Sequence, residues 1–315
     1  MSIDRVATSS QTAYFLSQIQ NAGHALDKTQ EQIASGKNAT TYAGFGDQTQ
    51  VLTATISVNA RNAAYATATK FAVTQTDLQD TQLTGLADLA ARLKKAVSDA
   101  VSNNDAKTLM TEVESIFDQA TAILNSKDAN GAYIYSGGKT DTAPVTVDSL
   151  AALEALPSIT DAFANGDLKK SVQVGDGVTV SYGLTASDIG TDLMQMLKDI
   201  ADFNAGTPFG TTDNLTGPQG DFLTGAIATL TNVADGLNAA TAANGYVANR
   251  LSDAQTQQTA LTTLYKGFVS TIQDTNMANA ATQLSLNQTQ LQAAIQVTAG
   301  LHQLSLLNFM PVSGG

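Results

Sequence analysis

The feature that most constrains this sequence is a seven-residue repeat in its C-terminal third. Two series of mostly apolar residues follow it, three positions apart: Leu230, Leu237, Asn244, Leu251, Gln258, Tyr265 and Ile272, then Val233, Ala240, Val247, Ala254, Leu261 and Phe268. Six heptads in one register predict a long coiled-coil helix, because both series fall on one side of an α-helix. Asn244 and Gln258 are polar members of the repeat and are expected to fix its register.

A similar helix is predicted at the N-terminus, from about Asp4 to Ala34. Its apolar stripe repeats every seven residues at Ile19, Leu26 and Ile33 and is extended by Leu16. Ser35-Gly36 supplies a helix stop, and residues 37–46 are expected to form a loop.

Two further helices are expected in the N-terminal half. Asp47 is expected to cap a long helix that reaches about Val101 and is broken by Asn103-Asn104. A third helix follows, with its apolar residues on one face at Leu109, Val113, Ile116, Ala120 and Ile123.

The middle of the chain changes character. Tyr133–Tyr135 and Val145–Val147 favour short strands. Val172–Val174 and Val178–Val180 flank the turn Gly175–Gly177, a pattern typical of a β-hairpin. The remaining segments predict short helices at 149–156 and 187–203 and an exposed loop at 204–220.

This order predicts a mainly α fold in which long N- and C-terminal helices pair as an antiparallel coiled-coil rod. A smaller α/β middle domain containing the β-hairpin is expected at the far end of the rod. Five segments follow: 1–47 (N-terminal assembly helix and loop), 48–130 (rod, N-terminal side), 131–220 (β-containing outer domain), 221–274 (rod, C-terminal side) and 275–315 (C-terminal assembly helix).

The two ends of the chain avoid charge. No Asp, Glu, Lys or Arg occurs from Val6 to Leu26 or from Thr275 to Gly315. Faces of Gln, Asn, Ser and Thr are buried against other helices at modest desolvation cost, because their amides and hydroxyls bond to one another. The ends are therefore predicted to assemble with neighbouring subunits, through Leu16, Ile19, Leu26, Ile33, Leu284, Leu291, Ile295, Leu301, Leu304, Leu306, Leu307 and Phe309.

Composition argues against several other functions. The net charge of −12, without a basic stripe, argues against nucleic acid. There is no Cys, and His24 and His302 have no carboxylate in their own charge-free segments, so no catalytic, cofactor or metal site is predicted and the chain is not expected to be an enzyme. No apolar run reaches bilayer-spanning length, and the start Met1–Arg5 lacks the pattern of a cleaved signal peptide, so neither membrane insertion nor signal-peptide export is expected.

Four segments carry a resemblance to a known family. They are Leu26–Lys37 with its Ser-Gly-Lys stop, Glu112–Asp128, Asn130–Pro144 and the Leu-Leu-rich Gln303–Met310. Together they resemble the flagellin superfamily, and Asn130–Pro144 is most similar to the subunits at the hook–filament junction. Asn38–Asp47 departs from the family, which usually has an Asp-Asp turn there. The segment from about Thr146 to Gly220 matches no family motif.

The resemblance implies a self-assembling structural subunit of the bacterial flagellum, at the hook–filament junction or, alternatively, in the filament as flagellin. It implies an extracellular location, export through the flagellar type III apparatus without a cleaved signal peptide, and guidance by an export chaperone. The implied partners are copies of the chain and other flagellar axial proteins. A secreted helical adhesin or glycan-binding surface protein is the alternative from a different class.

Overall fold

The computed structural model describes residues 3–210 and 214–307, with side chains at 10, 12–210 and 214–300. The described residues fall into two compact units. The terminal unit lies within Met1–Arg61 and Leu261–Gly315, and the central unit is Asn62–Ala260. Each unit is therefore built from both halves of the sequence.

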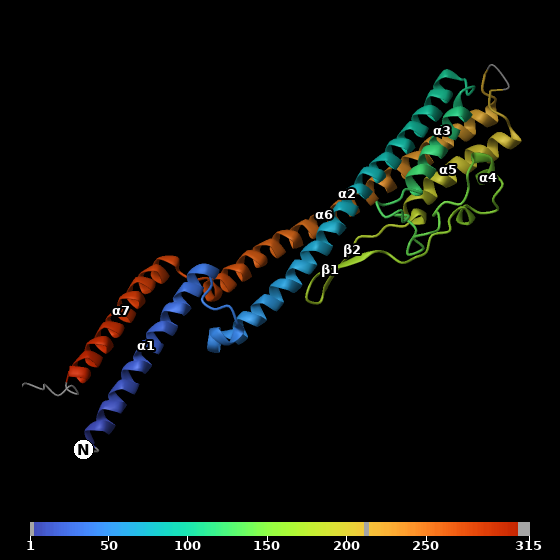
Figure 1. The fold of residues 1–315 in the computed structure, drawn as a ribbon. Coiled ribbons are helices and arrows are strands. Elements are labelled where there is room, and N and C mark those ends of the chain that lie inside the picture. Colours follow the sequence, from blue (N-terminus) through green and yellow to red (C-terminus); the bar gives the residue numbers. More distant parts are fainter. Residues whose placement is uncertain (1–2, 211–213, 308–315) are drawn as a thin grey trace, which may run out of the picture. The chain divides into compact units, whose positions relative to one another are not determined.

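Long helices make up most of both units (Figure 1). In chain order the elements are α1 Ile3–Ser35, the 3-10 helix η1 Tyr42–Gln48, α2 Thr49–Asn103, α3 Leu109–Leu124, α4 Leu150–Glu154, the 3-10 helix η2 Ile159–Ala162, β1 Ser171–Gly175, β2 Val178–Ser181, α5 Ala186–Gly206, α6 Gly217–Gln273 and α7 Met277–Leu307.

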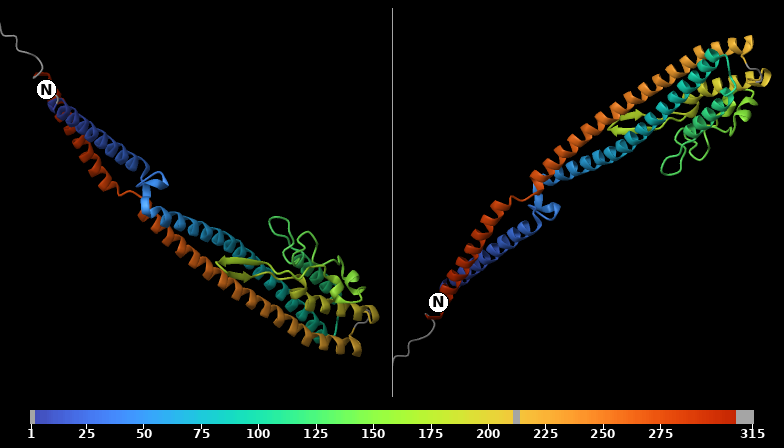
Figure 2. Two further views of the ribbon diagram at one scale, coloured as in Figure 1. Left: turned by 90° about the horizontal axis from the view of Figure 1, so that it is seen from below. Right: turned by 90° about the horizontal axis from the view of Figure 1, so that it is seen from above.

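In the terminal unit, α1 packs antiparallel against α7, and the two helices lie side by side in every view (Figures 1 and 2). The predicted pairing of the first and last helices is confirmed. The first helix ends at Ser35 and is followed by Gly36 at a φ of +69°, a left-handed conformation that favours glycine and stops the helix.

The predicted cap at Asp47 is wrong. Asp47 lies inside η1, and α2 begins two residues later, at Thr49. The 3-10 helix already begins at Tyr42, before Asp47. The Thr49 N–H donates to the Gly46 carbonyl, and the Thr49 hydroxyl donates to the Tyr42 carbonyl at 2.6 Å.

In the central unit, α2 packs antiparallel against α6, as the heptad repeat predicts. The repeat positions within this unit are buried: Leu230, Leu237, Asn244, Leu251 and Gln258. Both predicted register residues bond across the helix pair. The Asn244 amide donates to the Thr76 carbonyl at 3.0 Å, and the Gln258 amide donates to the Thr69 hydroxyl at 2.9 Å.

The central core continues where α3 and α5 join this pair. The stripe predicted for α3 is buried at Leu109, Val113, Ile116 and Ala120, with Ile123 packed at its edge. On α5, the fully buried Leu193, Met194 and Leu197 belong to the same cluster. This continuous apolar core accounts for the compactness of the unit.

Two predicted strands are absent from the described residues. Tyr133 and Val145 each form only an isolated bridge, with Lys127 and Phe163. The Tyr133 and Ile134 N–H groups donate to carbonyls in nearby turns instead of to a neighbouring strand. Tyr135, whose ring is fully buried and whose hydroxyl donates to Gln82 at 2.6 Å, fixes this irregular segment against α2.

The predicted hairpin is present. β1 and β2 pair antiparallel, with an irregularity between Gln173 and Gly175, and their Val172 and Val180 side chains pack with Ala72 of α2 and Leu251 of α6. The hairpin is also hydrogen-bonded to both helices. The Gln258 amide donates to the Val174 carbonyl at 2.7 Å, and the Tyr65 hydroxyl donates to Asp176 at 2.8 Å.

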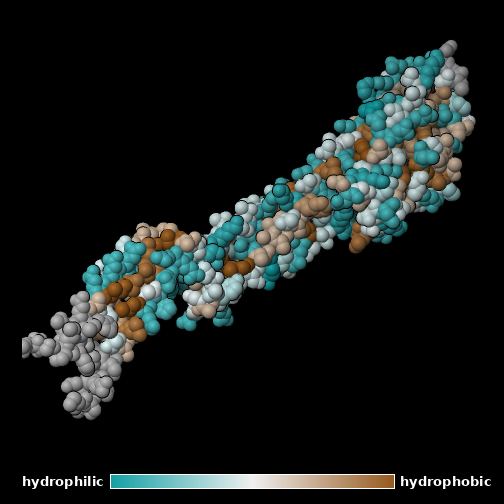
Figure 3. Space-filling model, in the orientation of Figure 1, coloured by the Kyte–Doolittle hydropathy of each residue, from teal (hydrophilic) through white to brown (hydrophobic). Residues whose placement is uncertain are grey.

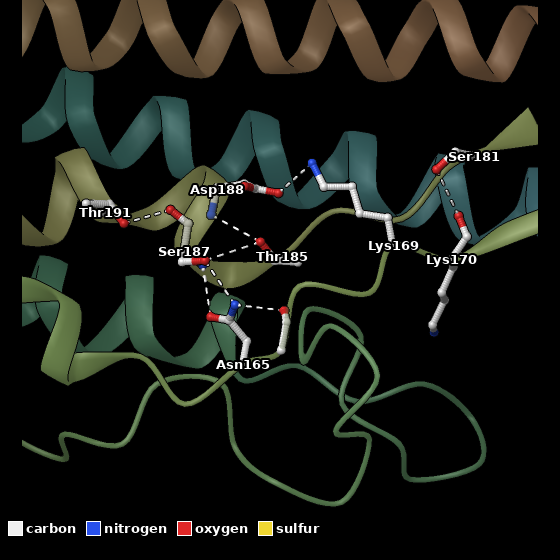
Figure 4. Close-up of polar contacts among 9 residues, drawn as sticks. Asn165, Lys169, Lys170, Ser181, Thr185, Ser187, Asp188 and Thr191 are labelled. Carbon is white, nitrogen blue, oxygen red and sulfur yellow. Dashed lines mark hydrogen bonds and ion pairs between the residues drawn. The ribbon is translucent and has the colours of Figure 1, made fainter.

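Polar side chains join the base of the hairpin to the start of α5 (Figure 4). Thr185 caps α5 by accepting from the Asp188 N–H, while Asn165 donates to the Ser187 hydroxyl at 2.9 Å and accepts from the Ser187 N–H. Lys169 and Asp188 form an ion pair at 2.9 Å. The hairpin is thus attached both at its turn and at its base.

Gln258 is the residue on which we expect the packing of the hairpin to depend most. Its amide donates to both the Thr69 hydroxyl and the Val174 carbonyl inside the protein. We expect Gln258→Ala to lower the free energy of unfolding of the central unit by about 1–3 kcal/mol, because two buried acceptors lose their donor. Chemical denaturation followed by circular dichroism measures this. Gln257→Ala, at the exposed neighbouring position, is the control, and equal effects of the two substitutions would contradict the prediction.

Asp188 gives the central unit a pH-dependent contribution. Partial burial alone would raise the pKa of its carboxyl, but hydrogen bonds from Lys169 and Thr185 outweigh burial and hold the pKa below its usual value. A carboxyl with a depressed folded pKa stabilises the fold above its unfolded pKa of about 3.9, and this contribution is lost as the pH falls through the folded pKa.

We therefore expect Asp188→Asn to destabilise the protein at pH 7 by less than about 1 kcal/mol, because the pair is partly exposed. The difference from wild type should shrink as the pH is lowered below about 4. Denaturation curves at several pH values measure it, with Asp192→Asn as a control for loss of charge on the same helix. A difference that stays constant down to pH 2 would exclude the ion pair as its cause.

Candidate assembly interface

Five of the predicted assembly residues lie along one seam between α1 and α7. Ile19, Leu26 and Ile33 on α1 and Leu284 and Leu291 on α7 are all half-buried. Each set keeps the seven-residue spacing, so the two helices meet along a single narrow stripe. This stripe is half-buried rather than buried, because no third helix of the terminal unit covers it within the described residues.

Other predicted residues lie off this seam. Leu16 and Ile295 are 55% and 50% exposed. The side chains of Leu301, Leu304, Leu306 and Leu307 lie outside the described residues, as does Phe309 altogether. An assembly role for all these residues stays a prediction.

A buried polar contact sits at the middle of the seam. Asn287 is 8% exposed, and its amide donates to the Thr29 hydroxyl at 2.9 Å and to the Ala25 carbonyl at 3.1 Å. The Thr29 hydroxyl donates in turn to the same Ala25 carbonyl at 2.8 Å. Sequence reasoning did not single out this contact, although Asn287 stands three residues after Leu284, where a heptad places its second seam position.

Backbone hydrogen bonds join the segment after α1 to the segment between α6 and α7. We call these residues, 36–38 and 272–275, the clip. The Asn38 N–H donates to the Gln273 carbonyl at 2.7 Å, and the Thr275 N–H donates to the Gly36 carbonyl at 2.9 Å. The Asn38 side chain adds a bond to the Ile272 carbonyl at 2.9 Å and accepts from the Thr275 hydroxyl. The clip therefore fixes the end of α1 beside the break between α6 and α7.

Charged side chains gather next to the clip. A cavity of about 190 Å³ is lined there by Lys28, Glu31 and Lys37, among others, and the Thr40 hydroxyl donates to Glu31 at 2.6 Å. Away from the clip, α1 carries no charged residue from Val6 to Leu26, and α7 carries none at all. Among the described residues, no three His, Cys, Asp or Glu side chains converge as a metal site.

The outer faces of the pair carry exposed apolar residues. Tyr14 on α1 and Leu286 and Val297 on α7 are 48–60% exposed. Figure 3 shows apolar surface over the described part of these two helices. An exposed apolar surface without charges is suited to contact with another protein surface. The geometry thus defines a class: a mainly helical protein whose first and last helices pair and expose apolar side chains.

The family comparison agrees with that class. Residues 227–310 match the family described as the bacterial flagellin C-terminal helical region. The matched segment contains most of α6 and the described part of α7. This C-terminal part of the chain is therefore similar to the flagellin C-terminal helical region.

Two curated relatives extend the match. Flagellar hook-associated protein 3 of Salmonella typhimurium is 26% identical over 189 residues, which is 59% of this chain and 56% of the relative. The Escherichia coli protein of the same name is 27% identical over 118 residues, 36% of this chain and 37% of the relative. The chain thus spans about half the length of the first relative and about a third of the second.

Solved structures share the fold. A protein described as a flagellar hook-associated protein from Vibrio parahaemolyticus has a TM-score of 0.55 at 18% identity, covering 71% of this chain and 97% of its own. Bacillus cereus FlgL has a TM-score of 0.52 at 14% identity, covering 69% and 98%. The chain is thus distantly similar in sequence to flagellar hook-associated protein 3 and shares the fold of the two solved structures. None of its described helices is long and apolar enough to cross a bilayer.

The Asn287 contact makes the order of α1 depend on α7. We expect Asn287→Ala to speed amide hydrogen exchange at residues 25–29 of α1, because the Thr29 hydroxyl and the Ala25 carbonyl lose a buried donor worth about 1–2 kcal/mol. Hydrogen exchange with mass spectrometry measures this on the full-length protein. Gln288→Ala, at the exposed next position, is the control. Unchanged exchange in α1 of the Asn287 variant would show that this contact does not hold the pair together.

Proposed function

We propose that this chain is a structural subunit of the bacterial flagellum that assembles at the hook–filament junction through its terminal helices. The observation that carries the proposal is the α1–α7 pair: its two helices meet along a half-buried seam, expose apolar side chains and carry no charge over residues 6–26 and 277–307. Two relatives named hook-associated protein 3 support the choice of the junction.

The assembly residues follow from the same pair. Ile19, Leu26, Ile33, Leu284 and Leu291 hold the two helices together, whereas Leu16 and Ile295 face outward toward neighbouring subunits. In this proposal segments 1–47 and 275–315 form the assembly part, segments 48–130 and 221–274 are helical supports, and segment 131–220 faces outward.

The proposed partners are copies of this chain and other flagellar axial proteins, including hook-associated proteins and flagellin. The ends pass through the flagellar export apparatus unfolded, after guidance by an export chaperone. The absence of charge supports burial of the ends at the growing tip, because uncharged polar side chains that become hydrogen-bonded are buried at modest desolvation cost.

A second candidate, flagellin of the filament itself, is favoured by one observation. The matched family is described as the C-terminal helical region of bacterial flagellin, so its description names flagellin itself. The two candidates differ in copy number and position, so an experiment on whole flagella separates them.

Deleting the gene and tagging its product tests the proposal. We expect a few copies per flagellum, seen at the proximal end of the filament, and a deletion strain that keeps its hooks but releases flagellin into the medium. Quantitative mass spectrometry of sheared filaments and fluorescence microscopy provide the measurements. A product that dominates the sheared filaments would identify a flagellin instead, and full motility of the deletion strain would reject both flagellar candidates.

A separate prediction concerns the terminal helix α7. Truncation after Asp274 removes α7 together with the rest of the charge-free tail, so we expect loss of incorporation into flagella while the central unit stays folded. The central core of α2, α3, α5 and α6 does not include residues beyond 274. Circular dichroism checks the fold and fractionation checks incorporation. Normal incorporation of the truncated chain would refute the assembly role of α7.

A further inference from the structure

Three Asn-Gly pairs occur in the sequence: Asn130-Gly131, Asn165-Gly166 and Asn244-Gly245. In such a pair the backbone nitrogen of the glycine is close enough to attack the side-chain carbon Cγ of the asparagine. Glycine favours this attack because it has no Cβ to shield its nitrogen and leaves the backbone free to rotate. The attack needs an asparagine side chain and a glycine N–H that are both free to move, so the fold decides which of the three pairs reacts.

The pair Asn244-Gly245 is held inside the central unit. Asn244 is 4% exposed, and its amide donates to the Thr76 carbonyl at 3.0 Å. Both residues lie in the middle of α6, where the Gly245 N–H is part of the helical hydrogen-bond ladder. Attack at this pair requires α6 to open and the bond between α2 and α6 to break, so the fold protects it.

The pair Asn165-Gly166 is held at both reacting groups. The Asn165 amide donates to the Ser187 hydroxyl at 2.9 Å and accepts from the Ser187 N–H at 3.2 Å (Figure 4). The Gly166 N–H donates to the carbonyl of the buried Ser136 at 2.9 Å. A Cβ on Gly166 would stand 2.4 Å from the Gly137 carbonyl oxygen, so the backbone is closely packed here. This pair is protected as well.

The pair Asn130-Gly131 differs at each of these points. Both residues are exposed in a turn, and the Asn130 side chain makes no hydrogen bond to any residue that the structure describes. The Gly131 N–H donates to the Asp128 carbonyl at 2.9 Å, a bond within the same turn that opens without unfolding a helix. A Cβ added at Gly131 would meet nothing within 4 Å, so the surroundings of this glycine leave its backbone accessible.

We propose that Asn130 is a site of spontaneous deamidation in the folded protein and that Asn165 and Asn244 are protected from it. The Gly131 nitrogen loses its proton to water and attacks Cγ of Asn130. A C–N bond forms, the side-chain nitrogen leaves as ammonia, and a cyclic succinimide remains. Water then hydrolyses either of the ring carbonyls, which gives aspartate or isoaspartate. The reaction consumes one water and needs no oxidant or cofactor, and it does not depend on the assembly function proposed above.

The product changes the turn in two ways. It adds a negative charge beside Asp128, whose carboxyl accepts from the N–H groups of Asn130 and Ala132 at 2.8 and 3.1 Å. Isoaspartate also adds a CH₂ group to the backbone between Asp128 and Ala132, where the Asp128 N–H donates to the Ala132 carbonyl at 2.8 Å. This turn leads directly into the segment that the buried Tyr135 fixes against α2. Isoaspartate at position 130 is therefore expected to loosen residues 126–134.

The first test measures all three pairs in one sample. The full-length protein is incubated at mildly alkaline pH, and peptide mapping by mass spectrometry follows each conversion. We expect Asn130 to convert about tenfold faster than Asn165 and Asn244 or more, a factor that corresponds to about 1.4 kcal/mol in the activation free energy. Its rate should rise with pH, because the attacking nitrogen must lose its proton.

The same incubation in denaturant is the control. The three rates should become similar there, because each asparagine is followed by glycine and the fold no longer separates them. Equal rates in the folded protein would overturn the proposal. An unchanged excess at Asn130 in the denatured chain would also overturn it, because the fold would then not be the cause.

The second test examines the turn itself by hydrogen exchange. After incubation, wild type is expected to exchange faster at residues 126–134, in proportion to its isoaspartate content. Asn130→Gln should show neither the conversion nor the faster exchange, and Asn130→Asp adds the charge without the CH₂ group and separates the two effects. Unchanged exchange in converted wild type would overturn the loosening of the turn. Equally faster exchange in the incubated Asn130→Gln variant would overturn the assignment to Asn130.

Discussion

Buried amide side chains decide which residues face each other in the helix pairs of this protein. Gln258 and Asn244 bond across α2 and α6, and Asn287 bonds across α1 and α7. An apolar heptad seam alone tolerates a shift by seven residues, because leucines then meet other leucines. A shifted amide loses its partner inside the protein, at a cost of about 1–3 kcal/mol. The hairpin depends on the same register, since its Val174 carbonyl is held by Gln258.

Periodicity was sufficient to predict this architecture because the helices are long. Each added heptad repeats the information about which side of the helix is buried, and the polar Asn244 and Gln258 stand out against it. Single contacts do not repeat in this way. The sequence does not indicate that Gln258 reaches Val174, 84 residues away, or that backbone groups of Asn38 and Thr275 meet residues at the other end of the chain. Tyr133–Tyr135 has the composition of a strand, but the Tyr133 and Ile134 N–H groups donate to carbonyls in nearby turns.

The residues of the candidate site likewise fall into those whose placement follows from spacing and those whose placement does not. Spacing placed Ile19, Leu26, Leu284 and Leu291 on the heptad stripes of the first and last helices, and all four are half-buried in the α1–α7 pair. It does not distinguish residues that face the partner helix from apolar residues that face outward, such as Ile295. A helix that is covered on two sides carries apolar residues around much of its circumference, as α2 does where it packs against both α6 and α3.

The two units therefore differ in what their stability depends on. The central unit contains a continuous core with many fully buried side chains from α2, α3, α5 and α6, which is sufficient to fold a domain of its size. The α1–α7 pair has one half-buried stripe, a single buried amide contact and the clip, so much of its apolar surface stays in contact with water. Each apolar square ångström covered by a neighbouring subunit contributes roughly 25 cal/mol, and no charge has to be desolvated in exchange. In the proposed assembly, burial of this pair against neighbouring subunits would complete its fold, whereas the central unit already contains a continuous core of its own.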